Sequence, residues 1–148
     1  METRLASASD APLLTALHAD CFGDASWSLA QITDSLALAT TYAVIASEAG
    51  ASCGFIFCQI AGGEADILTL CVAPSARRKG MAHLLLETLL VEAKRRDVQR
   101  IFLEVAVDNG GALALYQKAG FHSIGIRPNY YRLGGVAVDA VLLEWCGE

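Results

Sequence analysis

The chain lacks any long hydrophobic run. Although 54% of its 148 residues are hydrophobic, no uninterrupted apolar stretch exceeds seven residues, whereas a membrane helix needs about 20. The first ten residues, METRLASASD, contain no apolar core of the kind found in signal peptides. We therefore expect a soluble, cytoplasmic protein without a membrane partner, folded as one domain over residues 1–148.

Cysteine and histidine occur, but not in the patterns of disulfide frameworks or metal sites. The five cysteines form no C-x-x-C pair, and the three histidines are scattered at positions 18, 83 and 122. An odd number of unpaired cysteines is poor material for a disulfide framework. We expect neither structural disulfides nor a metal cofactor.

Basic residues are scarce in the first half of the chain. Residues 1–76 hold eight acids and a single base, Arg4, whereas seven of the eleven cations lie between positions 77 and 100. The net charge of -5 argues against direct nucleic-acid binding. The clustered cations indicate a local anion site, and the acidic half is consistent with either ordinary solubility or a cationic partner.

The apolar pattern predicts a mixed α/β domain. Runs rich in β-branched and aromatic residues over 41–47, 52–61 and 64–73 are separated by glycine-containing turns, which indicates antiparallel strands. A helix over 81–96 and a strand over 100–107 then complete a crossover unit, so the strands flanking that helix should be parallel. The other expected elements are strands over 3–6, 122–131 and 136–145, and helices over 9–22, 27–37 and 109–120.

Local signals mark several helix ends. Ser9 or Asp10 is expected to cap the first helix, and Ser26 or Ser28 the second, because their side chains can accept hydrogen bonds from free N–H groups. Gly120 supplies a left-handed position after the helix over 109–120.

The start of the helix at residue 81 carries charges that its dipole disfavours. Arg77, Arg78 and Lys79 precede Gly80 at a helix end that is already positive, because its N–H groups are free. A bound phosphate resolves this conflict, and Gly80 and Ala82 keep the approach to the backbone open. A solvated basic loop without a ligand is the alternative that these residues leave open.

The spacing around this loop resembles the acyl-CoA signature of the GNAT N-acetyltransferase superfamily, V-x-P-x-x-(R or Q)-x-x-G-x-(G or A). Its specified positions are filled by Val72, Pro74, Arg77, Gly80 and Ala82. A later family segment, N-x-x-A-x-x-L-Y-x-x-x-G-F, is matched by Asn109, Ala112, Leu115, Tyr116, Gly120 and Phe121. The element order also resembles that of the family, so the resemblance covers essentially the whole chain.

The resemblance implies a fold and a cosubstrate. The GNAT fold is a mixed, mostly antiparallel sheet of six to seven strands with about four helices, and its central parallel pair splays apart at the CoA site. Acetyl-CoA is then the cosubstrate. By this resemblance, the residues that contact it are Leu70, Cys71, Val72, Arg77, Arg78, Lys79, Gly80, Met81, Ala82, His83, Asn109 and Tyr116.

A narrower resemblance is to RimI-type ribosomal-protein-alanine N-acetyltransferases. The segments FLEVAVDNGGALALYQKAGF and GIRPNYY are similar to that subfamily in the order of L-E-V, A-L-Y, G-F and R-x-N-Y-Y. The chain departs from the pattern at Asp108, where serine is usual, at Gly110 and Gly111, and at Ala25 and Ser26, which lack the proline before Trp27.

Acetyl transfer to an amine needs a base and an acid. Glu104 interrupts an otherwise apolar strand and corresponds to the subfamily's catalytic glutamate, so it is the expected base, directly or through water. Tyr116 is the expected acid, since a phenol stays protonated at neutral pH and can donate to a thiolate. The alternatives are a surface ion pair of Glu104, for example with Arg127, and a purely structural core role for Tyr116.

Two further roles are considered. Cys71 could carry the acetyl group covalently, but no histidine neighbours it in sequence and cysteine is common on buried strands. By resemblance to related enzymes, an acceptor groove is expected from Trp27, Arg127, Asn129, Tyr130 and Tyr131, with an ordinary hairpin surface as the alternative.

These patterns together predict an acetyl-CoA-dependent N-acetyltransferase of protein N-terminal α-amines. The resemblance suggests the N-terminal alanine of a small-subunit ribosomal protein as acceptor. A GNAT enzyme acting on lysine or a small-molecule amine, and a CoA-binding module without turnover, are the alternatives.

Overall fold

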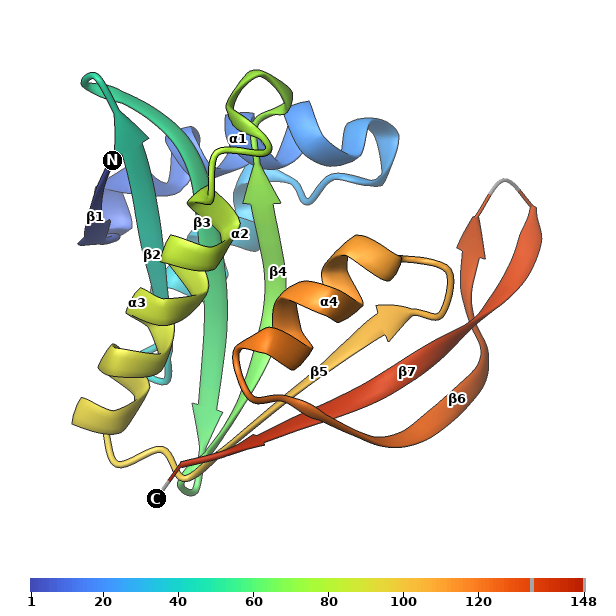
Figure 1. Cartoon of the computed structure of the whole chain (residues 1–148). Coiled ribbons are helices and arrows are strands. Elements are labelled where there is room, and N and C mark those ends of the chain that lie inside the picture. The colour runs from blue at the N-terminus through green and yellow to red at the C-terminus, as the bar shows by residue number, and fades with distance from the viewer. Residues whose placement is uncertain (134, 148) are drawn as a thin grey trace.

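The computed structural model describes residues 1–133 and 135–147 of the chain (Figure 1). Within them, strands and helices follow one another in the order expected from the sequence. The strands are β1 (Glu2–Leu5), β2 (Thr41–Glu48), β3 (Ala51–Ala61), β4 (Glu64–Val72), β5 (Arg100–Ala106), β6 (His122–Leu133) and β7 (Val136–Cys146). The helices are α1 (Ala11–Phe22), α2 (Leu29–Leu36), α3 (Met81–Arg95) and α4 (Gly110–Lys118), with short 3-10 turns at Ala8–Asp10, Gly23–Ala25 and Pro74–Ala76.

The strands form one sheet in the order β1-β2-β3-β4-β5-β7-β6. All neighbouring pairs are antiparallel except β4 and β5, which confirms the expected mixed sheet with a central parallel pair. Pairing of β4 with β5 is confined to Glu64–Asp66 against residues 100–102, and Figure 1 shows the two strands diverging beyond that point. The β5-facing backbone groups of residues 67–72 therefore have no strand partner.

Helices cover the two faces of the sheet unequally. α3 and α4 lie on the near face in Figure 1, over a core that includes Leu86, Ile101 and Phe121. α1 and α2 lie on the opposite face, where a second core contains Leu14 and Phe57. Their contacts are with β2, β3 and β4, so this face of the sheet is covered only over its first half in the described part of the chain.

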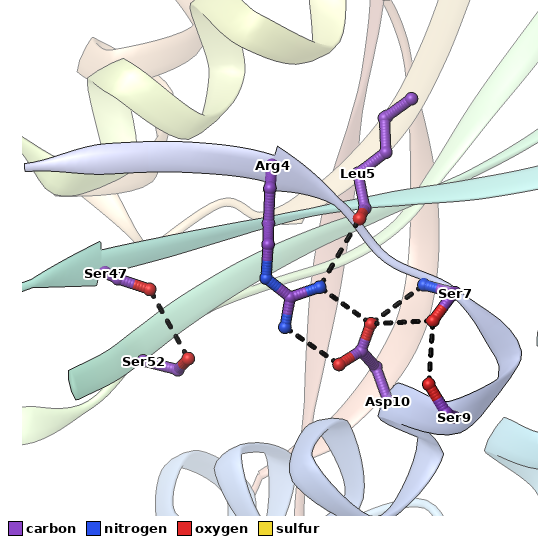
Figure 2. A network of polar contacts seen from close by, with 7 residues as sticks. All are labelled: Arg4, Leu5, Ser7, Ser9, Asp10, Ser47 and Ser52. Atoms are coloured by element: carbon purple, nitrogen blue, oxygen red, sulfur yellow. Dashed lines mark hydrogen bonds and ion pairs between the residues drawn. The ribbon is translucent and has the colours of Figure 1, made fainter. Parts of the chain in front are cut away.

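The start of α1 differs from the expected cap. The Arg4 guanidinium contacts both carboxylate oxygens of Asp10 at 2.8 Å, and the Ser7 N–H donates to the same carboxylate at 2.8 Å (Figure 2). These hydrogen bonds hold the pKa of Asp10 at about 2. Asp10 is the N-cap residue of α1, one of the two predicted positions, but its carboxylate turns back toward Arg4 and Ser7 and forms no cap hydrogen bond with the helix.

The other helix ends follow the sequence signals. Ser28 precedes α2 and accepts the N–H of Gln31 at 3.1 Å, and Gly120 follows α4 with a φ of 103°. Lys94 and Arg95 lie in the last turn of α3, where cations stabilise the negative helix end. None of the helices in the described residues is long and apolar enough to cross a membrane.

Candidate functional site

Three cavities adjoin one another where β4 and β5 diverge. The loop cavity, of about 620 Å³, lies between the end of β4, residues 76–80 and the starts of α3 and α4. The central cavity, of about 730 Å³, lies between Trp27, the middle of β4, β5 and α4. The hairpin cavity, of about 470 Å³, lies between β4, β5 and the β6–β7 hairpin. Each volume falls within the roughly 300–1,000 Å³ typical of ligand sites.

Neighbouring cavities share parts of their walls. The loop and central cavities are both lined by Phe22, Leu70, Asn109 and Ala112. The central and hairpin cavities are both lined by Ile67, Leu68, Leu103, Glu104 and Tyr131. The three cavities therefore follow one another along the divergence of β4 and β5.

The backbone beside the loop cavity is rich in free donors. The N–H groups of residues 78–83 have no acceptor in the described chain, and no side chain caps α3. Gly80 adopts a φ of 83°, and a Cβ placed on it would meet no atom within 4 Å. Arg78 also lies in the left-handed region, with a φ of 65°. Consecutive free N–H groups at a helix N-terminus form an anion site, so the residues present fit a pyrophosphate.

The predicted side chains of this loop divide into two groups. Arg77 and Arg78 line the loop cavity, and Arg77 Nε donates to the Val72 carbonyl oxygen at 2.9 Å, which leaves its terminal nitrogens for a ligand. Lys79 and His83 are not among the lining residues. They pair instead with carboxylates, Lys79 with Glu48 at 3.6 Å and His83 with Glu87 at 2.9 Å.

The remaining predicted contacts of the loop cavity lie together. Its lining includes Leu70, Cys71, Val72, Gly80, Met81, Ala82 and Asn109. The Asn109 side-chain oxygen accepts the Ala112 N–H at 3.1 Å and so begins α4, while its amide nitrogen has no hydrogen-bond partner in the described residues. This amide can donate to a ligand at the junction of the loop and central cavities.

Cys71 is poorly suited to a covalent role. It is only 1% exposed, and burial raises the pKa of its thiol, so the nucleophilic thiolate is disfavoured. Its polar neighbours are the Thr69 hydroxyl at 3.9 Å and the nearby Cys21, neither of which is a general base.

Glu104 lines both the central and the hairpin cavity. Its side chain is 26% exposed, and its Oε1 pairs with Arg127 at 3.0 Å. This is the ion pair that the sequence raised as an alternative to catalysis. The Glu104 carboxylate also lies beside Tyr130, where its hydrogen bond and its charge raise the pKa of the Tyr130 hydroxyl. Because Glu104 lines two cavities, its side chain can still be reached by a ligand or a water.

Tyr116 combines a core position with access to the central cavity. It is 5% exposed and packs edge-on against Phe121 with ring centroids 5.5 Å apart, which agrees with the structural alternative. Its hydroxyl has no hydrogen-bond partner in the described chain. Every fully buried side-chain oxygen there has a partner, so the Tyr116 hydroxyl is not fully buried. It is therefore reachable from the central cavity, which Tyr116 lines. Burial raises the pKa of Tyr116, which keeps the phenol protonated.

The predicted acceptor residues on the hairpin lie in different environments. Tyr130 and Tyr131 line the hairpin cavity, and the Tyr131 hydroxyl donates to the Glu104 backbone carbonyl at 3.0 Å. Arg127 lies over the Tyr130 ring at 4.7 Å from its centroid. Asn129 does not line the three cavities; its backbone N–H donates to Asp139 at 2.9 Å within an irregular part of β6.

His18, which the sequence did not predict as a site residue, supports Trp27 in the wall of the central cavity. His18 on α1 is 3% exposed. The Trp27 backbone N–H donates to its Nδ1 at 3.0 Å, its Nε2 lies 3.4 Å from the Thr69 hydroxyl, and its ring stacks on the Trp27 indole at 4.6 Å. Burial lowers the pKa of His18, consistent with a neutral ring. The sequence signal that could have predicted its burial is its spacing, because His18 follows the apolar Leu14 by four residues on a helix that packs on the sheet.

Asp66 is a second residue of the site that the sequence did not predict. It lines the hairpin cavity with Glu104, and desolvation together with the charges of Glu104 and Glu64 raises the pKa of its carboxyl group. The Asp66 carboxylate forms no hydrogen bond or ion pair in the described residues. The lining of the hairpin cavity holds two acids and no base, although Arg127 pairs with Glu104, whereas the lining of the loop cavity holds Arg77 and Arg78.

Comparisons with known proteins agree with this geometry. The profile of the acetyltransferase (GNAT) family matches residues 12–121. The chain is 34% identical over 132 residues to N-alpha-acetyltransferase RimI of Mycobacterium tuberculosis strain H37Rv, a match that covers 86% of this chain and 82% of that protein.

A second relative matches over a shorter region. The chain is 35% identical over 94 residues to the ribosomal protein bS18-alanine N-acetyltransferase of Escherichia coli strain K12. That match spans 64% of this chain and 64% of the relative.

Among solved structures, the crystal structure of the ribosomal-protein-S18-alanine N-acetyltransferase from Escherichia coli superposes with a TM-score of 0.89 at 26% identity. The superposition covers 98% of this chain and 94% of that one. The family profile covers most of the chain, and the parallel pair diverges beside a loop whose free N–H groups fit a pyrophosphate. The chain therefore belongs to the acetyltransferase (GNAT) family.

Proposed function

We propose that this protein transfers the acetyl group of acetyl-CoA to the N-terminal α-amine of a protein, and that its acceptor is the N-terminal alanine of a small-subunit ribosomal protein. The observation that carries the proposal is the position of Glu104 and Tyr116, which line one cavity between a basic and an acidic one. The names of the relatives support the choice of acceptor. Such an acceptor would place the reaction in the cytoplasm.

Acetyl-CoA supplies the acetyl group already activated as a thioester. The free N–H groups of residues 78–83, with Arg77 and Arg78, would hold its pyrophosphate. The unpaired edge of β4 at Leu70–Val72 would hold the extended arm, and a backbone N–H there would polarise the carbonyl oxygen. Because the Val72 carbonyl already accepts from Arg77 and Cys21, Leu70 offers the freer backbone groups on this edge.

Glu104 would remove the proton from the acceptor amine, directly or through water. An α-amine has a pKa of about 8, against about 10.4 for lysine, so a carboxylate can deprotonate it more readily near neutral pH. Its side chain is partly exposed and lines two cavities, so the amine can reach the carboxylate while Arg127 stays paired with Oε1. The amine nitrogen then attacks the carbonyl carbon as the bond to sulfur breaks.

Tyr116 would return a proton to the departing sulfur. Its raised pKa keeps the hydroxyl protonated, and the sulfur leaves as a thiolate, whose conjugate thiol has a pKa of about 8.5. Proton transfer from the phenol therefore makes the sulfur a better leaving group. The two proton transfers balance, since one proton leaves the amine and one reaches the thiol.

The acceptor would enter between Trp27 and the β6–β7 hairpin. Trp27 lines the central cavity and Tyr130 the hairpin cavity, so the two aromatic side chains would contact different parts of the acceptor. Tyr131 supports the second wall through its bond to β5. Arg127 would orient Glu104, and Asn129 would contribute at the rim of the hairpin.

A matched set of peptides tests the proposal. One peptide begins with a free alanine, a second has the same sequence with a blocked N-terminus and one lysine, and release of free CoA thiol is measured with each. We expect turnover with the first peptide only. Faster reaction of the lysine peptide or of small amines would favour another GNAT acceptor, and tight CoA binding without any turnover would favour a binding module.

A further inference from the structure

His18 occupies a position where a buried histidine connects two elements of the site. It lies on the inward side of α1 with Leu14 and Leu17, and it is 3% exposed. Both ring nitrogens have polar neighbours, the Trp27 backbone at one end and the Thr69 hydroxyl of β4 at the other. The ring therefore spans the distance between the Trp27 wall and the strand that borders the central cavity.

The hydrogen bonds assign the ring's protonation. A backbone N–H can only donate, so Nδ1 must be the unprotonated acceptor for Trp27. The proton of the neutral ring then lies on Nε2, from which it can be donated to Thr69. His18 thus acts as an acceptor toward one wall and a donor toward the other.

Packing and a few polar contacts hold the segment that carries Trp27. Trp27 packs against the second core, and its indole lies edge-on to Phe57 with ring centroids 6.5 Å apart. Residues 23–25 form a 3-10 turn, and the Ser26 N–H bonds back to Gly23 within that turn. Among the described residues, the bond from Trp27 to His18 is the hydrogen bond that connects residues 24–27 to α1. Stacking of the imidazole on the Trp27 indole, with ring centroids 4.6 Å apart, adds to this attachment, and the Phe22 ring lies tilted against the imidazole at 4.4 Å.

We propose that His18 is a positioning residue for the acceptor, holding the Trp27 wall against β4 so that the acceptor amine is presented to Glu104. The inference rests on the proposed function, because it assigns the entry of the acceptor to this wall. His18 lines the central cavity but not the loop cavity, so binding of the pyrophosphate end of the donor should be independent of it.

Two isosteric substitutions separate the two ends of the ring. In His18→Asn, the side-chain oxygen takes the place of Nδ1 and can still accept from Trp27. In His18→Gln, the side-chain nitrogen takes the place of Nε2 and can still donate to Thr69, but the Trp27 acceptor is lost. His122→Gln on the exposed start of β6 is the matched control, and thermal unfolding confirms that each variant is folded.

Kinetics with an alanine-initiated peptide should distinguish these variants. We expect His18→Gln to raise the acceptor KM about tenfold, the change expected from losing one hydrogen bond. His18→Asn should stay within about threefold of the wild type, and the KM for acetyl-CoA should be unchanged in both. Equal acceptor KM values in the Asn and Gln variants, or a parallel rise in the acetyl-CoA KM, would overturn the proposal.

A measurement without turnover separates this inference from the proposed function. In ¹H–¹⁵N spectra of the imidazole ring, His18 should show a bare Nδ1 and a protonated Nε2. The Trp27 amide should be protected from hydrogen exchange in the wild type and in His18→Asn, and should lose that protection in His18→Gln. If these results hold but no peptide is acetylated, the proposed function fails while the attachment stands. A protonated Nδ1 or an unprotected Trp27 amide overturns the inference itself.

Discussion

The loop cavity and the hairpin cavity lie at opposite ends of the same divergence of β4 and β5, and they are built differently. The loop cavity presents backbone N–H groups and two arginines, whereas the hairpin cavity presents the side chains of Asp66, Glu104 and two tyrosines. An anionic donor and a cationic acceptor would therefore be drawn to different ends. The central cavity, where both would meet, holds the two groups that can exchange protons with them.

The difference also indicates how each end can change. Backbone donors at a helix start depend mainly on Gly80 and the local turn, so they tolerate variation of neighbouring side chains. The acceptor end depends on individual side chains from α1, β4, β5 and β6, and replacing one of them changes what the cavity recognises. The predictions below test this separation, from the largest expected effect to the smallest.

Replacing Glu104 by glutamine should have the largest effect. The amide cannot accept the amine proton, so kcat should fall by about 10²–10⁴-fold, the usual contribution of a general base. The dissociation constant of acetyl-CoA, measured by calorimetry, should stay within about twofold, because Glu104 does not line the loop cavity. A variant that retains full kcat would assign the base to another group.

Replacing Tyr116 by phenylalanine should lower kcat by about 10- to 10²-fold. Phenylalanine keeps the edge-on packing on Phe121, so the thermal midpoint should shift little. Steady-state kinetics and thermal unfolding of the same preparation separate the two roles of this residue. A loss of stability without a loss of kcat would indicate that Tyr116 is only a core residue.

The double substitution of Arg77 and Arg78 by alanine should weaken the donor end alone. We expect the acetyl-CoA KM to rise about tenfold at low salt and by a smaller factor at 0.5 M salt, since screening already weakens the wild-type contacts. The acceptor KM should not change. Lys118→Ala, at the exposed end of α4, is the matched control, and an equal effect there would indicate a general loss of positive charge.

Asp66→Asn should act on the acceptor end alone, with a smaller effect. For a peptide with a basic residue after its first alanine, we expect the acceptor KM to rise about threefold, because an exposed charge pair contributes roughly 0.2–1 kcal/mol. A peptide with a neutral residue at that position should be unaffected. Glu64→Gln provides the control, since Glu64 pairs with Arg100 outside the three cavities. Identical responses to the two peptides would contradict the prediction.

Asp10→Asn should leave the KM values for acetyl-CoA and for the acceptor unchanged and should alter only the free energy of unfolding. The hydrogen bonds from Arg4 hold the pKa of Asp10 at about 2, below its ordinary value of 3.8. Its contribution is therefore present above pH 3.8 and is lost as the pH falls toward 2. We expect the variant to be destabilised by about 1 kcal/mol at pH 6 and to approach the wild type near pH 2, as measured by urea unfolding. A constant difference across this range would exclude ionisation as its source.

The predictable parts of the molecule are those encoded by short-range patterns. Strand alternation, helical spacing and glycine positions gave the element order, and the crossover rule gave the parallel pair. Asp10 holds the predicted N-cap position of α1, but its carboxylate pairs with Arg4 on β1 and does not bind the helix N–H groups. The predicted ion pair of Glu104 with Arg127 is present, and the same side chain lines two cavities, so its role as a base stays a prediction.

The composition of the loop cavity was largely anticipated, and that of the acceptor end was not. Most residues of the loop cavity fall within one continuous segment whose spacing is visible in the sequence. His18 and Thr69 are 51 positions apart, and Asp66 and Glu104 lie on different strands, so their proximity has no local signature. Lys79 and His83 share the predicted segment, but nearby carboxylates pair with them instead.

The sequence by itself determined the family, the order of strands and helices, and the basic loop before α3, because each depends on residues that are neighbours along the chain. The tertiary structure decided how far β4 and β5 stay paired, that Glu104 pairs with Arg127, and how His18 connects the Trp27 wall to β4. These features depend on how distant segments pack, and side-chain packing and hydrogen bonding in three dimensions choose among arrangements that the sequence pattern alone allows.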